Sequence, residues 1–323
     1  MTSSSLSLSF PRQIRPLYFP PFQISRPFPS TRHKPLTAKP KDDGGGGGDD
    51  GIPSDLVKTL AKFHSEHNYI RVLQVSRRAD HPFAGSRLLL LDKPGNIHSI
   101  SNPFRHPNDL LTDTYFDVFA TLPPLLPPGP IAILGFGAGT AARLILSLYP
   151  ESEVHGWEID PAVIAVAREY FGLAELEREH GARVRVRVGD AFGASVGGGF
   201  AGAVVDLFER GSLVKGVGEV EVGGGEEGVE GGGRVMVNVG GRCVEAESGV
   251  GGGVVGMEEA LMAMSVGFGG EVSVLSLGDD DCTVALTGEL PHLGKWKEML
   301  PCHELRAYAD MWRPYDPRGL AQR

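Results

Sequence analysis

The chain has 323 residues, of which 41% are hydrophobic, and its formal net charge at neutral pH is −9. This length allows one large or two small domains, each with a hydrophobic core. No apolar run approaches the roughly 18 residues that span a bilayer. The acidic balance argues against a nucleic acid as the main partner, because phosphate binding needs a basic surface.

Residues 1–41 differ in composition from the rest of the chain. They contain no Asp or Glu but seven Lys or Arg, seven Ser and eight Pro. This composition is typical of a chloroplast transit peptide, and the alternative is a disordered basic tail. Without this segment, 24 basic residues face 40 acidic ones. Such a charge suits a cationic substrate such as a polyamine, although solubility alone explains it equally well.

The next segments predict a flexible linker and then a small domain rich in β-hairpins. Residues 42–51 (DDGGGGGDDG) have the composition of a linker. The spacing of apolar residues in 52–67 predicts a helix. Strands are expected at 69–75, 87–91 and 97–100, the last two joined by the turn DKPGN. We therefore expect a small N-terminal domain over residues 52–109.

From residue 110 onward the pattern predicts a single α/β domain that ends near residue 290. A helix over 110–122 precedes a Pro-rich break, and strands then alternate with helices, which implies a parallel sheet. The expected strands are 131–134, 154–159, 183–188, 201–207 and 234–239, followed by a helix at 257–266 and an antiparallel hairpin of 271–277 and 282–287. The expected fold is Rossmann-like, a seven-stranded, mostly parallel sheet with helices on both faces.

Two further segments complete the expected organisation. Residues 189–256 hold 23 of the 45 glycines, and GGGEEGVEGGG is of low complexity. We expect a weakly ordered insertion over 215–233, because each glycine inside a helix costs roughly 1 kcal/mol. Residues 291–323 are expected to form a C-terminal tail. Within it, surface packing or disorder is expected for Trp312–Arg318, and the alternative is that this segment covers the site or an oligomer contact.

A glycine-rich turn follows the first strand of the α/β domain. Gly135, Gly137 and Gly139 follow the apolar run 131–134, and Glu158 lies about 20 residues further on, at the end of the next strand. Glycines let the backbone turn sharply beside a ligand, and an acid at this distance accepts hydrogen bonds from ribose hydroxyls. A dinucleotide turn has a further glycine where this chain has Thr140. The pattern therefore favours an adenosine-containing ligand of the S-adenosylmethionine type.

Acidic residues stand at three successive strand ends, where α/β sheets bind their ligands. Glu158 is expected to bind the ribose, and Asp190, with Ala191 beside it, to bind adenine. Asp206 and Glu209 are expected to face the acceptor as catalytic residues. Backbone N–H groups of the glycine turn are expected to face the tail of the ligand, near a helix N-terminus. Loop solvation or helix capping is the alternative explanation for any one of these acids.

With these motifs, residues 69–290 resemble the spermidine synthases, polyamine aminopropyltransferases within the class I S-adenosylmethionine-dependent fold. Gly135–Gly139 resembles the family's G-G-G-D-G turn, and Asp206-Leu-Phe-Glu209 its D-S-S-D segment. Further matches are Glu158-Ile-Asp160 with E-I-D, Gly189-Asp190 with G-D, and Asp113–Pro123 with the segment that carries the family's Tyr and Glu. The resemblance implies that Tyr115 and Asp117 bind the substrate, that the donor is S-adenosylmethionine or its decarboxylated form, and that an amine is the acceptor.

The chain also departs from the family pattern, and three functions therefore stay open. Ala138 replaces the Asp of G-G-G-D-G, and Phe116 and Thr121 replace a Gln/His and a His. The first reading is a plastid aminopropyltransferase or a protein derived from one. The second is an S-adenosylmethionine-dependent methyltransferase, which Ala138 favours, and the third is a non-catalytic homologue. A homodimer is compatible with each, and neither a metal, nor a nucleic acid, nor a membrane is expected as a partner.

Overall fold

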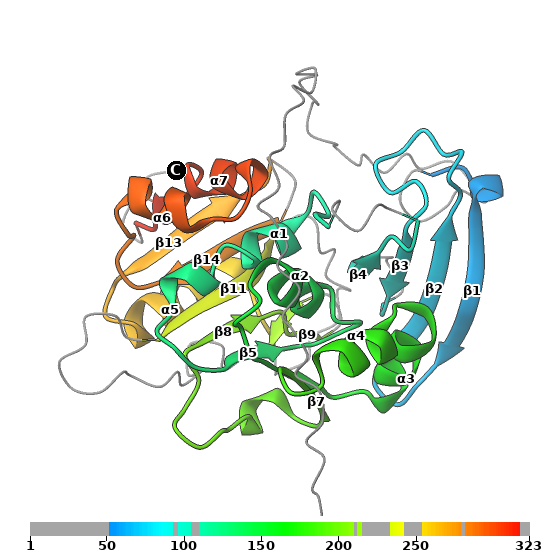
Figure 1. Cartoon of the computed structure of the whole chain (residues 1–323), viewed down its shortest axis with the longest axis horizontal. Coiled ribbons are helices and arrows are strands. Elements are labelled where there is room, and N and C mark those ends of the chain that lie inside the picture. Colours follow the sequence, from blue (N-terminus) through cyan, green and yellow to red (C-terminus); the bar gives the residue numbers. More distant parts are fainter. Residues whose placement is uncertain are drawn as a thin grey trace, which may run out of the picture. The chain divides into compact units, whose positions relative to one another are not determined.

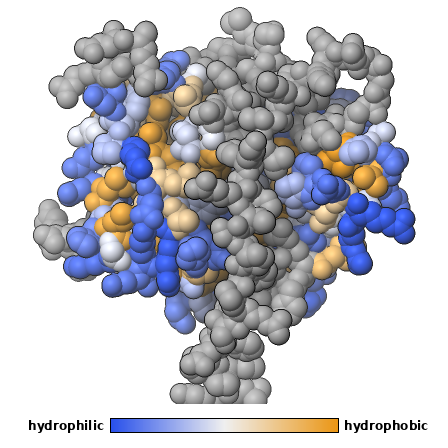
Figure 2. Space-filling view, turned by 90° about the horizontal axis from the view of Figure 1, so that it is seen from above, coloured by the Kyte–Doolittle hydropathy of each residue, from blue (hydrophilic) through white to orange (hydrophobic). Residues whose placement is uncertain are grey.

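The computed structural model describes residues 52–92, 96–104, 110–209, 212–214, 233–241, 254–278 and 282–316. All of them belong to one compact unit, Thr37–Arg323. The expected transit peptide and linker, and residues 215–232 of the expected insertion, lie outside the described residues. Within the described ranges, no helix has the length and apolar character to cross a membrane. On the face shown in Figure 2, hydrophobic and hydrophilic residues are interspersed, as on most protein surfaces.

The N-terminal part of the described chain is a four-stranded antiparallel meander in the order β1-β2-β3-β4 (Figure 1). A short 3₁₀ helix, η1 (Ser54–Leu56), leads into it. Its strands are β1 (Val57–His64), β2 (Tyr69–Val75), β3 (Arg87–Leu90) and β4 (Ile97–Ser101). The last three confirm the predicted strands, because their β-branched and aliphatic residues fill the buried side of this sheet.

The helix predicted over 52–67 is wrong, since most of this segment is β1. A β-bulge between Thr59 and Ala61 shifts the pairing of β1 with β2 by one residue. The half-buried residues Val57, Leu60 and Ala61 therefore follow a spacing of three and one instead of strict alternation. A bulge breaks the two-residue period of a strand, and the broken period resembled that of a helix.

The α/β part is built on an eight-stranded sheet in the order β15-β13-β14-β11-β8-β5-β6-β7. Five strands run parallel, and β14 and β13 form an antiparallel edge. The strands are β5 (Ile131–Leu134), β6 (Val154–Glu158), β7 (Val184–Val188), β8 (Gly202–Val205), β11 (Arg234–Gly241), β13 (Val272–Ser276), β14 (Cys282–Thr287) and β15 (Arg313–Pro314). The seven predicted strands and the predicted fold class are confirmed, and the two-residue β15 from the C-terminal segment is the eighth.

A small second antiparallel sheet follows β8. It contains β9 (Phe208–Glu209), β10 (Ser212–Val214) and β12 (Val254–Val255), with β10 in the middle. None of these short strands was expected. They have only two or three residues each, which is too short for a periodic pattern to show.

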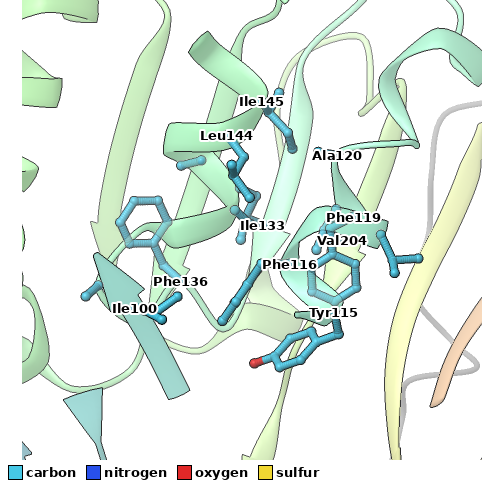
Figure 3. Packing of buried hydrophobic residues seen from close by; sticks show 14 of the residues in the cluster. Ile100, Tyr115, Phe116, Phe119, Ala120, Ile133, Phe136, Leu144, Ile145 and Val204 are labelled. Atoms are coloured by element: carbon cyan, nitrogen blue, oxygen red, sulfur yellow. The ribbon is translucent and has the colours of Figure 1, made fainter. Parts of the chain in front are cut away.

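Helices cover both faces of the large sheet unequally. Residues of α1 to α4, α6 and α7 join one hydrophobic cluster, and α5 packs on the other face. Figure 3 shows Leu144 and Ile145 of α2 and Phe116 and Phe119 of α1 packed around Ile133 of β5. The helices are α1 (Tyr115–Phe119), α2 (Thr140–Leu148), α3 (Pro161–Tyr170), α4 (Leu173–His180), α5 (Met257–Gly267), α6 (Leu293–Met299) and α7 (His303–Ala309), with the 3₁₀ helices η2 (Pro123–Leu125) and η3 (Ala191–Gly193).

The helices differ from the prediction at three places. The helix expected over 110–122 is shortened to α1 by the Thr114 cap on one side and η2 on the other. The helix α4 was not expected. Helices α6 and α7 lie in the segment taken as a tail, where Trp296 and Trp312 are buried. Helix α3 starts at Pro161, and Asp160 caps it by accepting a hydrogen bond from Ala162 N.

Side-chain hydrogen bonds join the meander to the α/β part. The Asp160 carboxylate accepts from Ser65 Oγ at 2.5 Å and from Asn68 Nδ2 at 2.7 Å, both in the β1–β2 turn. Thr140 Oγ1, at the start of α2, both accepts from Ile100 N and donates to Ile100 O, at 3.0 Å each. The two parts also share one hydrophobic cluster. The meander is therefore held against the carboxyl-terminal ends of β5 and β6.

Candidate functional site

The predicted glycine turn joins β5 to α2. Gly135, Gly137 and Gly139 have φ values of +84°, +54° and +84°, a region that glycine adopts without strain. A Cβ at Gly135 would lie 2.1 Å from the backbone oxygen of Asp206. Glycine is therefore needed at position 135 for both its conformation and the close approach of the β8 strand end.

All five backbone N–H groups of this turn already have acceptors within the protein. Gly137 N donates to Glu158 Oε2 at 2.9 Å, and Ala138 N donates to Ser99 Oγ at 2.8 Å. The remaining three, those of Gly135, Phe136 and Gly139, donate to backbone carbonyls. Two of these acceptors are side chains, Glu158 of β6 in the large sheet and Ser99 of β4 in the meander. That these N–H groups face the ligand's tail stays a prediction.

The aromatic residue inside the turn points toward the sheet. The Phe136 ring is 3% exposed and lies against Gly156 in β6, where a Cβ would come within 2.1 Å of it. The same ring lies 3.0 Å from the position of a Cβ on Gly139. Phe136 thus packs beneath the turn, and Figure 3 shows it beside Ile100 of β4.

The Glu158 carboxylate lies at the end of β6, as predicted, and is 7% exposed. It accepts from Gly137 N and, at 3.1 Å, from Asp160 N. Burial raises the pKa of Glu158, and these two hydrogen bonds oppose that rise. The backbone of Ile159 also donates to this carboxylate. A carboxylate has about four acceptor positions, so acceptor capacity remains for the predicted ribose role.

The ends of β6 and β7 combine an acid with exposed apolar side chains. Asp190 is exposed and caps η3 by accepting from Phe192 N at 2.9 Å, while Ala191 is buried. Ile159 and Phe192 are 50% and 44% exposed. Both follow strand ends that lie side by side, because Gly189 N donates to Glu158 O. Apolar surface next to a hydrogen-bonding acid is what a flat, polar-edged ring such as adenine needs.

A second group of polar side chains lies at the end of β8 and in the adjoining part of β11. The Asp206 carboxylate accepts from Tyr115 Oη at 2.9 Å and from Asn238 Nδ2 at 3.0 Å. Figure 3 shows the Tyr115 hydroxyl directed away from the packed rings of α1. Burial raises the pKa of Asp206, and the hydrogen bonds and nearby His98 oppose that rise. Burial and the Asp206 charge raise the pKa of Tyr115 well above its usual value, so the phenol stays a donor.

The other two predicted site residues, Glu209 and Asp117, have different surroundings in the structure. Glu209 ends β9, whose backbone pairs with Ser212, and its catalytic role stays a prediction. Asp117 is fully buried, and accepts from Thr112 N, Thr112 Oγ1 and Asp113 N at 2.7–3.1 Å. Burial raises the pKa of Asp117 to about 6. Asp117 thus holds the turn that precedes α1, and this placement does not favour direct contact with a substrate.

Two residues of the site were not predicted from the sequence. Asn238 is a single polar residue in the apolar run of β11, and Ser99 is an ordinary polar residue of β4. The position of Asn238 near the end of the expected strand 234–239 was a usable signal. Ser99 offered none, because its role depends on how the meander packs on the turn. Within the described residues, no group of three or more His, Cys, Asp or Glu is arranged to hold a metal ion.

Comparisons with known proteins agree with this architecture. No protein-family model matches the sequence, and neither does any curated protein. Among solved structures, a probable spermidine synthase from Corynebacterium glutamicum ATCC 13032 matches with a TM-score of 0.50 at 18% identity, over 77% of this chain and 93% of that chain. Spermidine synthase from Thermotoga maritima matches with a TM-score of 0.50 at 13% identity, over 82% and 86%.

These likenesses show the fold. The chain has the fold of these two spermidine synthases, here an antiparallel meander followed by a mostly parallel α/β sheet. The fold implied by the resemblance in sequence is therefore confirmed. Since unrelated chemistries share this fold, the activity has to be argued from the site.

Proposed function

We propose that this protein is an aminopropyltransferase that transfers the aminopropyl group of decarboxylated S-adenosylmethionine to an amine. The observation that carries the proposal is the Asp206 carboxylate, held by Tyr115 and Asn238 next to the Gly135 turn. This position, at the carboxyl ends of β5, β8 and β11, is where open α/β sheets bind ligands.

The adenosine half of the donor is assigned to the ends of β6 and β7. Glu158 would accept from the ribose hydroxyls with its remaining acceptor capacity. Asp190 and Ala191 would bind the edge of adenine, whose faces would lie against Ile159 and Phe192. Support for this assignment comes from the half-exposed state of both apolar side chains beside the adjoining ends of β6 and β7.

The chemistry needs a base more than an acid. The acceptor nitrogen attacks the carbon next to the sulfonium, a C–N bond forms, the C–S bond breaks, and the electron pair leaves with a neutral thioether. The attacking amine must be neutral, yet amines are mostly protonated near pH 7. A carboxylate at Asp206 can take the amine's proton, and it can bind the ammonium form by a charge-assisted hydrogen bond. Glu209 is proposed as a second acid for the same substrate.

Methyl transfer from intact S-adenosylmethionine is the second candidate. Ala138 favours it, since no carboxylate at this position opposes the donor's own carboxylate. The pairing of all five turn N–H groups weighs against it, because the turn has no free N–H donor for the carboxylate of the intact donor. A non-catalytic ligand-binding protein is the third candidate, and Phe116 and Thr121, both buried, are the departures that favour it.

The test is to incubate the full-length protein with each donor and a panel of amines, and to identify products by mass spectrometry. We expect 5′-methylthioadenosine from the decarboxylated donor, and none from Asp206→Asn. S-adenosylhomocysteine from the intact donor would instead establish methyl transfer. Calorimetric binding without any product would support the non-catalytic candidate, and neither binding nor product would refute all three.

We also propose that the protein works in the chloroplast and forms a homodimer. The composition of residues 1–41 supports the first proposal. Imaging of residues 1–51 fused to a fluorescent protein tests it, and a cytosolic signal would refute it. Light scattering after size-exclusion chromatography tests the second proposal, and a mass near 34.5 kDa, that of one chain, would refute it.

A further inference from the structure

Asn238 is a buried amide beside the Asp206 carboxylate. It is 2% exposed and lies in β11, one position past the last residue of that strand that pairs with β8. The parallel pairing of Val237 with Val205 sets Asn238 beside Asp206. A buried amide in an apolar strand is costly unless its groups are hydrogen-bonded, so its partners indicate why it is there.

The orientation of the amide follows from a local distortion of β11. A bulge lies between Asn238 and Gly240 in the pairing with β14, and Gly240 has a φ of +82°. This turn directs Gly240 N at Asn238 Oδ1, to which it donates at 3.0 Å. Since Oδ1 is thereby identified as the acceptor, the NH₂ group must face Asp206, whose Oδ1 lies 3.0 Å away.

The charge of the buried Asp206 carboxylate depends on hydrogen-bond donors such as the Asn238 amide. Tyr115 Oη of α1 donates to its other oxygen at 2.9 Å. His98 of β4 favours the ionised carboxylate electrostatically, and burial disfavours it. Among the described residues, these groups and Asn238 are the ones that act on the Asp206 charge. The amide N–H of Asn238 donates a hydrogen bond to the ionised carboxylate oxygen. It would lose this bond if the same oxygen carried a proton, so Asn238 favours the ionised form.

We propose that Asn238 is a positioning residue that fixes the orientation and the ionised state of Asp206, and so keeps it ready to accept a proton from the substrate amine. For the identity of the substrate, this role rests on the proposed function. The effect of Asn238 on Asp206 does not depend on the proposed function. Gly240 supports the arrangement by fixing the amide.

The test compares Asn238→Asp and Asn238→Ala with the unchanged protein. Asn238→Asp keeps the acceptor for Gly240 N–H and the volume of the side chain, yet places a second carboxylate against Asp206. Carbon-13 NMR of aspartate-labelled full-length protein follows the Asp206 carboxyl, assigned by its loss in Asp206→Asn. Asn102→Asp, outside this network, makes the same change of charge and is the control.

We expect the Asp206 titration to move upward by about one pH unit or more in both Asn238 variants, the effect of losing a hydrogen bond to a charged group. It should stay in place in Asn102→Asp. The acidic limb of the pH profile of kcat should move by the same amount, with a smaller change in KM.

A purely structural role for Asn238 predicts a different result. Asn238→Ala would then leave the Asp206 titration within about 0.3 pH unit of the unchanged protein, and this outcome would overturn the proposal. Asn238→Asp does not decide by itself, because its carboxylate raises the Asp206 pKa by like-charge repulsion. If Asn238→Ala fails to fold, Asn238→Leu, which has a similar volume and no amide donor, takes its place. If the unchanged protein turns over neither donor, the proposed function fails, while the carboxyl titration still tests Asn238.

Discussion

Replacing Gly156 by alanine should destabilise the protein through one identifiable contact. The new methyl group would lie 2.1 Å from Cδ2 and 2.6 Å from Cε2 of Phe136, where ordinary contacts are 3.4 Å or more. The ring is 3% exposed and has little room to move. Overpacking of a buried site typically costs 1–3 kcal/mol, and with two atoms overlapped we expect about 3 kcal/mol.

A double-mutant cycle with Phe136→Ala isolates this contact. Phe136→Ala by itself should cost about 3–5 kcal/mol, because it empties a buried site. In that background Gly156→Ala should cost less than about 1 kcal/mol, since the ring is gone. The coupling energy is therefore expected to be about 2 kcal/mol, which is within the range seen for residues in contact.

The assay is urea unfolding of the four full-length proteins, followed by circular dichroism. Stability is compared through the unfolding midpoint at an unchanged slope. An equal cost of Gly156→Ala with and without the Phe136 ring would refute the argument, since the ring would then not be the source of the strain. If Phe136→Ala is too unstable to measure, Phe136→Leu, which lacks the ring edge, takes its place in the cycle.

Three further outcomes are expected. Glu158→Ala should weaken binding of adenosine-containing ligands by at least about tenfold in calorimetry, the loss of about one charged hydrogen bond, and unchanged binding would remove the ribose role. Because burial raises the pKa of Asp117 to about 6, its contribution to stability is complete below about pH 4 and is lost as the pH rises through 6. Asp117→Asn should therefore flatten the stability curve between these values in urea titrations, and an unaltered curve would contradict this. Trp296→Phe should lower stability by about 1–3 kcal/mol, because Thr121 O loses the indole donor at 3.1 Å. The half-exposed Met299→Ala, on the same helix, should change it by less than about 0.5 kcal/mol.

The large sheet could be predicted from the sequence because its strands are short apolar runs bounded by Gly and Pro. Ile131–Leu134 follows a Pro-rich break and ends at Gly135, so its bounds are marked in the chain. In β1 no such marking exists. The bulge at Thr59 arises from pairing with a second strand, and a local pattern does not contain that information.

The site was predicted in outline for a similar reason. Glycines with positive φ and acids at strand ends are local features, and the sequence shows them directly. The partners of those groups are not local. Ser99 reaches Ala138 N across 39 positions in the chain, and Asn238 reaches Asp206 across 32. The sequence therefore indicated where a ligand could bind, but not that the turn's N–H groups were already paired.

The contacts of the meander with the glycine turn restrict how this protein can be divided or can evolve. A fragment that begins at residue 110 would lose Ser99, Ile100 and Ser65, and would leave Ala138 N, the Thr140 hydroxyl and part of the Asp160 carboxylate without their partners. The α/β half is thus unsuited to being transplanted as a minimal catalytic module. Substitutions in the meander and in the turn should co-vary, because each half supplies hydrogen-bond partners for the other.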